Sequence, residues 1–399
     1  MPGAASPQRG MILPALIVLL GLGGLGWLLA HHNTPADQAA RRLAAEIRST
    51  RALASARQAL IGFAATYREQ GHPNADYGYL PCPDLDGDGS AETCGNQGRA
   101  VIGRLPWLTL NLPDLRDGAG ECLWYAVSGN VKNNPKPTAL NWDSTGSFRL
   151  VDQSGGTVAL PGDPLGLAAA VIIAPGPPLP SQQRQAGPGR CGGDPDAAKL
   201  SAYVEAIGTP AASGTTDLQA ASPDSNDRIA VITITDLYLP LKSRGNYAGY
   251  LQGVLQATAD CLLHSGLPAP AGNQLLGPVR IGRLPALNGL SGPCRGDTLR
   301  DPVANWAGLM RYARCADGSD CLAGRLLTRC RGALIFGGER LASQPRLPPT
   351  DPAYPGAYLE DTTLAALGAG TLAPLSDRIN LPFSARLSPA STDVALCLP

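Results

Sequence analysis

Residues 102–106 read IGRLP, and residues 281–285 repeat the same five letters. Further matches follow in the same order: LRD at 115 and 299, AVII and ALIF at 170 and 333, SQQR and SQPR at 181 and 343, AYVE and AYLE at 202 and 357, and DRI at 227 and 377. The offset between copies falls from 179 residues (281 minus 102) to 150 (377 minus 227). Six ordered matches predict a tandem duplication of one structural unit.

The first copy is preceded by Met11–Ala30, twenty residues without a charge. At 1.5 Å per residue a helix of this length spans about 30 Å, the thickness of a bilayer's hydrocarbon core. A secretory signal peptide is the alternative, but its apolar region is usually shorter and ends in small residues, whereas this one runs straight into His31. The pattern predicts a retained anchor, and Arg9 before it favours a cytoplasmic N-terminus with the remainder exported.

Composition agrees with export and excludes nucleic-acid binding. All ten cysteines follow the apolar segment, in an even number that favours structural disulfides, and none forms the CxxC pair of zinc or redox sites. Charged residues make up 16% of the 399 residues, the formal net charge is zero and the basic residues are scattered. Such a chain lacks the electrostatic footprint for nucleic acid.

The next segment predicts a long helix. Apolar residues recur mostly at three-, four- and seven-residue steps, and residues 71–73 (GHP) end the pattern. These residues are Leu43, Ile47, Ala54 and Ile61, together with Leu53, Leu60, Ala64 and Tyr67. Short apolar runs after it predict an antiparallel sheet packed on this helix, so the expected fold class is α+β.

The duplication sets the expected domains. They are a leader at 1–10, a transmembrane helix at 11–30 that continues into the long helix, a first unit over 31–243 and a second unit over 246–399. The second unit has a helix of its own at 247–264, and we expect its sheet to be the smaller one because less sequence separates its apolar runs.

These motifs resemble type IV pilins and the pseudopilins of type II secretion systems. The family's leader ends in Gly, and residues 8–10 (QRG) before Met11 look like that end. Residues 59–65 (ALIGFAA) are similar to the pseudopilin helix before its head, and residues 80–84 (LPCPD) and 115–117 (LRD) are similar to its loops. The resemblance implies cleavage after Gly10, methylation of Met11, a prepilin peptidase, and pilin-like subunits with inner-membrane assembly proteins as partners.

One departure from the family narrows the expected function. Pilins normally carry Glu at the fifth mature position, where this chain has Ala15. Large tip subunits of secretion pseudopili also lack that acid. The resemblance therefore implies a minor or tip subunit of a type IV pilus or type II pseudopilus, anchored in the bacterial inner membrane with its heads in the periplasm or at a pilus tip. The alternative is a single-pass anchored extracytoplasmic binding or scaffold protein unrelated to pili.

An acidic loop is the most chemical motif. Asp84, Asp86 and Asp88 alternate in a Gly-containing stretch, and Glu92 follows. Alternating oxygen ligands suit Ca²⁺, which accepts several carboxylates and carbonyls. The twelfth position is Gly95 where an EF-hand has Glu, so a site would be incomplete or completed from elsewhere. The alternative is an acidic turn held by a disulfide.

Cys82 with Cys94 and Cys315 with Cys321 are the expected disulfides, because each pair closes a short loop containing turn residues. The repeated DR and SQxR motifs favour structural roles, since a fold constraint recurs in both copies of a duplicated chain. No catalytic motif such as GxSxG or HExxH occurs in the sequence, so we expect no enzyme; a hydrolase using carboxylates on unmarked loops remains the least favoured alternative.

Overall fold

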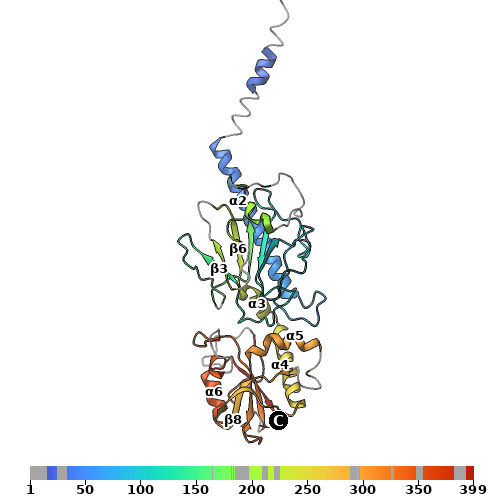
Figure 1. The fold of residues 1–399 in the computed structure, drawn as a ribbon, viewed down its shortest axis with the longest axis vertical. Coiled ribbons are helices and arrows are strands. Elements are labelled where there is room, and N and C mark those ends of the chain that lie inside the picture. Colours follow the sequence, from blue (N-terminus) through green and yellow to red (C-terminus); the bar gives the residue numbers. More distant parts are fainter. Residues whose placement is uncertain are drawn as a thin grey trace, which may run out of the picture.

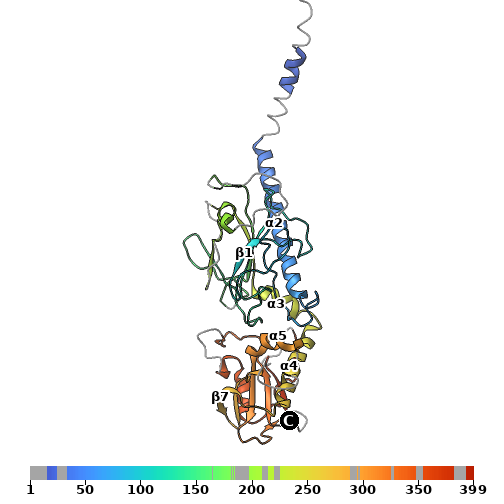
Figure 2. The same ribbon diagram turned by 45° about the vertical axis from the view of Figure 1, so that its right-hand side comes forward.

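The computed structural model describes residues 16–24, 34–163, 165–180, 182, 184, 197–208, 214–219, 225–287, 294, 297–324, 328–346, 354–381 and 392–399. Within these ranges the chain is mixed α+β with several sheets. Two units lie end to end along the long axis of the molecule (Figure 1). A long helix covers one side of the first unit, and a shorter helix covers the same side of the second (Figure 2).

The first unit is built on α2 (Pro35–Thr66) and a four-stranded antiparallel sheet. Its strands lie in the order β1 (Val101–Arg104), β2 (Trp124–Val127), β4 (Ala170–Ala174) and β6 (Arg228–Ile232). Beside this sheet, β3 (Phe148–Val151) pairs in parallel with β5 (Thr216–Gln219), near the 3-10 helix η1 (Ala197–Ala202). Apolar clusters cover both faces of the four-stranded sheet, α2 lying on one of them.

Sequence explains where α2 begins and which face it buries. The Thr34 side chain accepts the Asp37 N–H at 3.2 Å, Pro35 occupies the first turn, and Asp37 places a negative charge near the helix N-terminus. The buried positions in the C-terminal half recur at three- and four-residue steps: Ser49, Ala52, Leu53, Ala56, Leu60 and Ala64. The N-terminal half extends beyond the sheet and is largely exposed.

The second unit packs α4 (Tyr247–His264) on a five-stranded antiparallel sheet. The sheet order is β13 (Val394–Leu398), β12 (Gly332–Phe336), β9 (Met310–Cys315), β8 (Val279–Arg283) and β7 (Ala271–Leu276). The expectation of a smaller second sheet is wrong, because β7 adds a strand before the repeated IGR motif. A small β10 (Leu322–Ala323) and β11 (Arg329–Cys330) pair, α6 (Asp361–Gly368), and the 3-10 helices η4 (Ala307–Leu309) and η6 (Pro355–Ala357) complete the unit.

The two sheets share their strand order. However, the residues of β4 and β12 that are structurally equivalent are not those that the sequence match aligns. Ile172 and Leu334 both face the helix side, whereas Ile173 and Ile335 both lie in the cluster on the opposite face. The structural match is therefore Ala170–Ala174 with Gly332–Phe336, one residue away from the AVII and ALIF match. A one-residue slip moves every side chain to the other face of a strand. In the structural register Tyr125 matches Tyr312, since each lies opposite the equivalent residue of β4 or β12.

A shared apolar core joins the two units. One continuous cluster of buried residues runs from α2 through both sheets. At the junction, Trp142 of the first unit lies edge-on to Trp306 of α5 (Asp297–Trp306), with ring centroids 4.5 Å apart, and to Phe336 of β12 at 5.7 Å. Tyr238 of α3 (Ile234–Lys242), the helix that precedes α4, packs edge-on against the same tryptophans.

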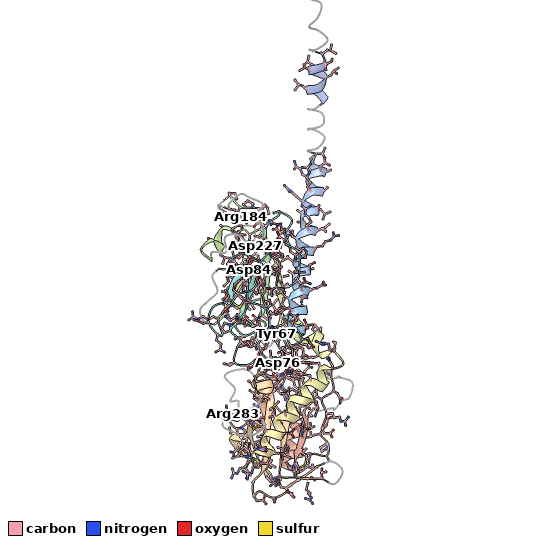
Figure 3. The ribbon with its side chains drawn as sticks, turned by 90° about the vertical axis from the view of Figure 1, so that its right-hand side faces the viewer. Tyr67, Asp76, Asp84, Arg184, Asp227 and Arg283 are labelled. Atoms are coloured by element: carbon pink, nitrogen blue, oxygen red, sulfur yellow. A yellow bond between two sulfur atoms is a disulfide. The ribbon has the colours of Figure 1, made fainter. Side chains whose placement is uncertain are left out.

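Asp76 is the polar centre of this junction (Figure 3). Only 1% of its surface is exposed. Oδ1 accepts the Tyr77 N–H at 2.8 Å and the Tyr250 hydroxyl at 2.9 Å, while Oδ2 accepts the Asn305 amide at 3.1 Å and the Trp306 indole N–H at 2.7 Å. Three of these four donors belong to the second unit. The carboxylate therefore joins the loop after α2 to α4 and α5.

The expected transmembrane helix over 11–30 is wrong. The helix described in this region covers residues 16–24, nine residues that rise about 14 Å, less than half of the hydrocarbon thickness. Among all the ranges described above, no helix combines the length and the apolar character that crossing a bilayer requires. The expectation of a single-pass inner-membrane anchor carrying the heads into the periplasm is corrected accordingly.

Ionisation of Asp76 should leave a measurable pH dependence. Burial is the main cause that raises the pKa of Asp76 from 3.8 to about 6. Between these values the folded protein holds a proton that the unfolded chain has lost, so the free energy of unfolding should fall as pH rises from about 4 to above 6. At about 1.4 kcal/mol per pKa unit, Asp76 accounts for about 3 kcal/mol.

Urea unfolding across this pH range, on the wild type and Asp76→Asn, measures that contribution. Asp227 and Asp393 also have raised pKa values and remain in the variant, so the difference between the two curves isolates Asp76. We expect the variant to be less stable, because its amide group faces donors, and to show the shallower slope. Parallel curves would contradict this account of Asp76.

Candidate functional site

The acidic loop brings all four predicted ligands together. One oxygen from each of Asp84, Asp86, Asp88 and Glu92 lies within 4.8 Å of the others. Asp84 is fully buried at the base of the loop, Glu92 is partly buried, and Asp86 and Asp88 are exposed. This arrangement of carboxylates can hold a metal ion. Carboxylate oxygens are the ligands of hard divalent cations.

The loop is fixed to the first sheet at its base. Asp84 exchanges two backbone hydrogen bonds with Arg104 at the end of β1, at 3.0 and 2.9 Å. The Cys82–Cys94 disulfide closes the loop. Behind it, the buried Lys132 ammonium donates to the Cys94 and Asn96 carbonyl oxygens at 2.6 and 2.8 Å. The carboxylates are therefore presented from a rigid support.

Backbone N–H groups already bind several of these oxygens. Asp84 accepts from Gly87 at 2.5 Å and from Gly89 at 2.8 Å, and Glu92 accepts from the Leu85 N–H at 2.6 Å. These are the bonds expected of an acidic turn without metal. They leave lone pairs available, since each carboxylate oxygen carries two.

The electrostatics of the loop favour a bound cation. The pKa values of Asp84 and Glu92 are raised, first by burial and then by the charges of neighbouring acids, among them Asp86 and Asp88. Clustered carboxylates repel one another, and either a proton or a cation relieves that repulsion.

The structure contains the two disulfides expected from loop length, Cys82–Cys94 and Cys315–Cys321. It also contains Cys261–Cys294 and Cys330–Cys397, which the sequence analysis did not pair. The last one links Cys330, at the end of β11, to Cys397 of β13, and these residues are close only after the C-terminal strand joins the sheet. Loop length alone carries no signal for such a pair. No free cysteine occurs among the described residues.

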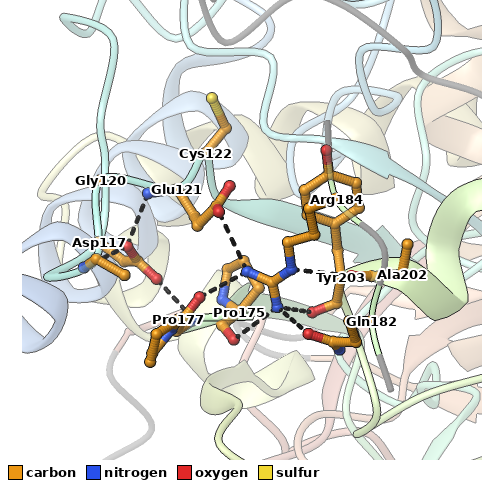
Figure 4. Close-up of polar contacts among 12 residues, drawn as sticks. Asp117, Gly120, Glu121, Cys122, Pro175, Pro177, Gln182, Arg184, Ala202 and Tyr203 are labelled. Carbon is orange, nitrogen blue, oxygen red and sulfur yellow. Dashed lines mark hydrogen bonds and ion pairs between the residues drawn. The ribbon is translucent and has the colours of Figure 1, made fainter. Parts of the chain in front are cut away.

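The SQxR motifs form the same structural cluster in each unit. Arg184 donates to the carbonyl oxygens of Gly176 at 2.7 Å and Ala202 at 2.8 Å and pairs with Glu121 at 3.2 Å (Figure 4). Arg346, whose side chain is 1% exposed, donates to the carbonyls of Gly338 at 2.8 Å and Tyr358 at 2.9 Å. Each guanidinium also binds the Gln two residues before it, so both arginines tie the end of a central strand to the following loop.

The DRI match pairs residues that are not structurally equivalent. Asp227 precedes β6, and its Oδ2 accepts the Glu205 and Ala206 N–H groups at 2.6 and 2.7 Å. In the second unit the residue before the equivalent strand is Asp393, which accepts the Glu360 N–H at 2.8 Å. Burial raises the pKa of Asp227 to about 7 and that of Asp393 to about 6. Asp377 instead lies in a loop whose backbone binds Gln252 of α4.

The two LRD stretches also lie in different kinds of structure. Residues 115–117 lie in a loop, where Asp117 accepts the N–H groups of Ala119, Glu121 and Gly176. Residues 299–301 lie within α5, and Asp301 pairs with Lys136 of the first unit at 2.9 Å.

The predicted processing residues, Gly10 and Met11, lie outside the described residues. Comparison of the chain with protein-family models, with curated proteins and with solved structures gave no match.

Packing at the acidic loop can be tested at Gly89. It has φ +92°, and a Cβ there would lie 2.6 Å from the Trp107 ring. Gly120 has nearly the same backbone, φ +88°, but open space around the position of a Cβ. Both Ala variants carry the cost of a left-handed backbone, about 1 kcal/mol. We expect Gly89→Ala to lower the free energy of unfolding by a further 1 to 3 kcal/mol, roughly the range for overpacking.

Chemical denaturation of the two variants side by side measures the difference. Equal losses would show that the loop moves away from Trp107 at no cost, and would contradict the rigid support described above.

Proposed function

We propose that the chain is a minor or tip subunit of a pilin-like filament, a type IV pilus or a type II secretion pseudopilus, and that it acts by assembly and contact without catalytic turnover. The proposal rests on the resemblance of its sequence motifs to pilins and pseudopilins. Pilin-like subunits are its proposed partners. Its support in the structure is an exposed apolar stripe on α2, which the described part of the chain does not bury.

The stripe consists of Leu43 and Ile47, one helical turn apart on the part of α2 that extends beyond the sheet. Their side chains are 58% and 41% exposed. Ser49 and Leu53, which contact the head, lie on another face of the helix. An exposed apolar stripe on a helix suits packing against a helix of a second chain.

The arrangement of the two units supports a terminal position. The N-terminal part of α2 projects from the first unit on the side away from the second unit (Figure 1). If α2 packs against helices of other subunits, the second unit of this chain lies beyond the first. It would then occupy the position that the head of the next subunit in the filament needs. A subunit of this shape fits the end of a filament, where no further head must be accommodated.

Charge substitution in the stripe tests the proposal. Leu43→Arg with Ile47→Arg would place two charges in an apolar helix contact, and burial of an unpaired charge is strongly unfavourable. We expect at least a tenfold loss of co-purifying pilin-like subunits from the native host. Gln38→Arg is the matched control, because Gln38 is exposed on a different face of the same helix.

Intact-mass spectrometry in the presence of a prepilin peptidase gives an independent readout. Loss of residues 1–10 with methylation of Met11 is the expected result. Unchanged partner recovery in the double variant together with an uncleaved N-terminus would overturn the proposal.

We also propose Ca²⁺ as the ion of the acidic loop. The four acids offer an all-oxygen set, two of them exposed to an arriving ion, and the flexible coordination of Ca²⁺ tolerates the backbone bonds that Asp84 and Glu92 already make. Mg²⁺ demands stricter octahedral geometry and is the natural comparison.

Thermal unfolding with and without metal tests this assignment. At 100 times the dissociation constant a bound ion stabilises the fold by about 2.7 kcal/mol, so Ca²⁺ should raise the melting temperature by several degrees. Asp86→Asn with Asp88→Asn should abolish the shift, whereas Asp217→Asn, an exposed acid in β5, should keep it. An equal shift in all three proteins would place the ion elsewhere.

A further inference from the structure

A groove of about 1180 Å³ runs between the N-terminal half of α2 and the start of β6. One wall is α2 from residue 41 to 57, and the other is formed by residues 118–119, 174, 176–177, 219 and 225–230. Neither the pilin resemblance nor the metal loop accounts for it. The groove also lies away from the Leu43 and Ile47 stripe, because neither of these residues lines it.

The groove is strongly basic in a chain whose net charge is zero. Five arginines line it, against two acids: Arg41, Arg42, Arg48, Arg57 and Arg228 against Glu46 and Asp227. Arg228 pairs with Glu46 at 2.8 Å, and Arg57 pairs with Asp236 at 2.6 Å. Arg42 and Arg48 remain exposed on α2, and Arg48 donates to the Gly118 carbonyl oxygen at 3.0 Å. Neither Arg42 nor Arg48 forms an ion pair with an acid among the described residues.

Apolar side chains also line the groove. Leu53, Ala174, Pro177 and Ile229 are among the lining residues, and no aromatic residue occurs among the lining residues that the structure describes. A sugar chain would lack rings to stack on. An extended peptide offers carboxylates and small apolar side chains together.

We propose that this groove binds an extended acidic segment of a partner protein. Carboxylates of the segment pair with Arg42 and Arg48, and its apolar side chains lie along Pro177 and Ile229. The inference does not depend on the pilin-like function, since it concerns a different face of α2.

Fluorescence anisotropy with a labelled octapeptide of alternating Glu and Val tests the proposal on the full chain. We expect saturable binding that weakens as NaCl is raised, because exposed charge pairs are screened by salt. Arg42→Glu should weaken binding at least tenfold. Arg51→Glu is the matched control, because Arg51 is exposed on the same helix and does not line the groove. Circular dichroism of both variants verifies that the helix is intact.

A further probe tests the sign of the charge that the groove recognises. An octapeptide of alternating Lys and Val should not bind. Equal binding by Arg42→Glu and Arg51→Glu would overturn the site. Equal competition by an oligouronate of the same charge would overturn the assignment to a peptide.

Discussion

The shape of the molecule depends on one buried carboxylate and the aromatic rings around it. Asp76 follows α2 in the chain, yet three of its four hydrogen-bond donors come from α4 and α5. Asn305 extends the network by accepting the Leu140 N–H at 2.9 Å and the Tyr79 hydroxyl at 3.2 Å. Apolar rings exclude water from these bonds. Loss of the network would leave several buried donors unpaired at once, so the two units are joined by hydrogen bonds that demand one relative orientation.

Sequence could predict the local elements but not the junction. The spacing of Leu53, Leu60 and Ala64 gives the buried face of α2, and the short Cys82–Cys94 loop points to its own disulfide. Asp76 and Asn305 stand 229 residues apart and belong to no motif. Their pairing follows from the packing of one unit on the other, which short-range patterns do not record. The expectation of a membrane span failed differently, since an uncharged run of twenty residues set the prediction and the described helix covers only nine of them.

The repeated sequence motifs match some structurally equivalent residues correctly and others incorrectly. IGR falls at equivalent places in β1 and β8, where Gly103 and Gly282 lie opposite the matched tyrosines. In the central strands apolar residues follow one another on both faces, so AVII fits ALIF by letter although the true register is one residue away. Asp393 was missed because the residues after it, VA, share no letter with the RI after Asp227. A strand buried on both faces accepts many apolar residues, and identity there carries little information about register.

Contacts that occur in both units are those that the shared fold requires, and features of one unit alone are specific to that unit. Both keep the guanidinium that binds the end of the central strand, the Gln beside it and the carboxylate before the last strand of the repeat. The acidic loop and the arginine-lined groove belong to the first unit, at the start of its sheet and beside α2. In the second unit the corresponding helix, α4, is shorter, and its Tyr250 donates to Asp76 together with Asn305 and Trp306 of α5. The second copy thus uses its helix side to join the first, while the first retains the surfaces that remain available to ions and other proteins.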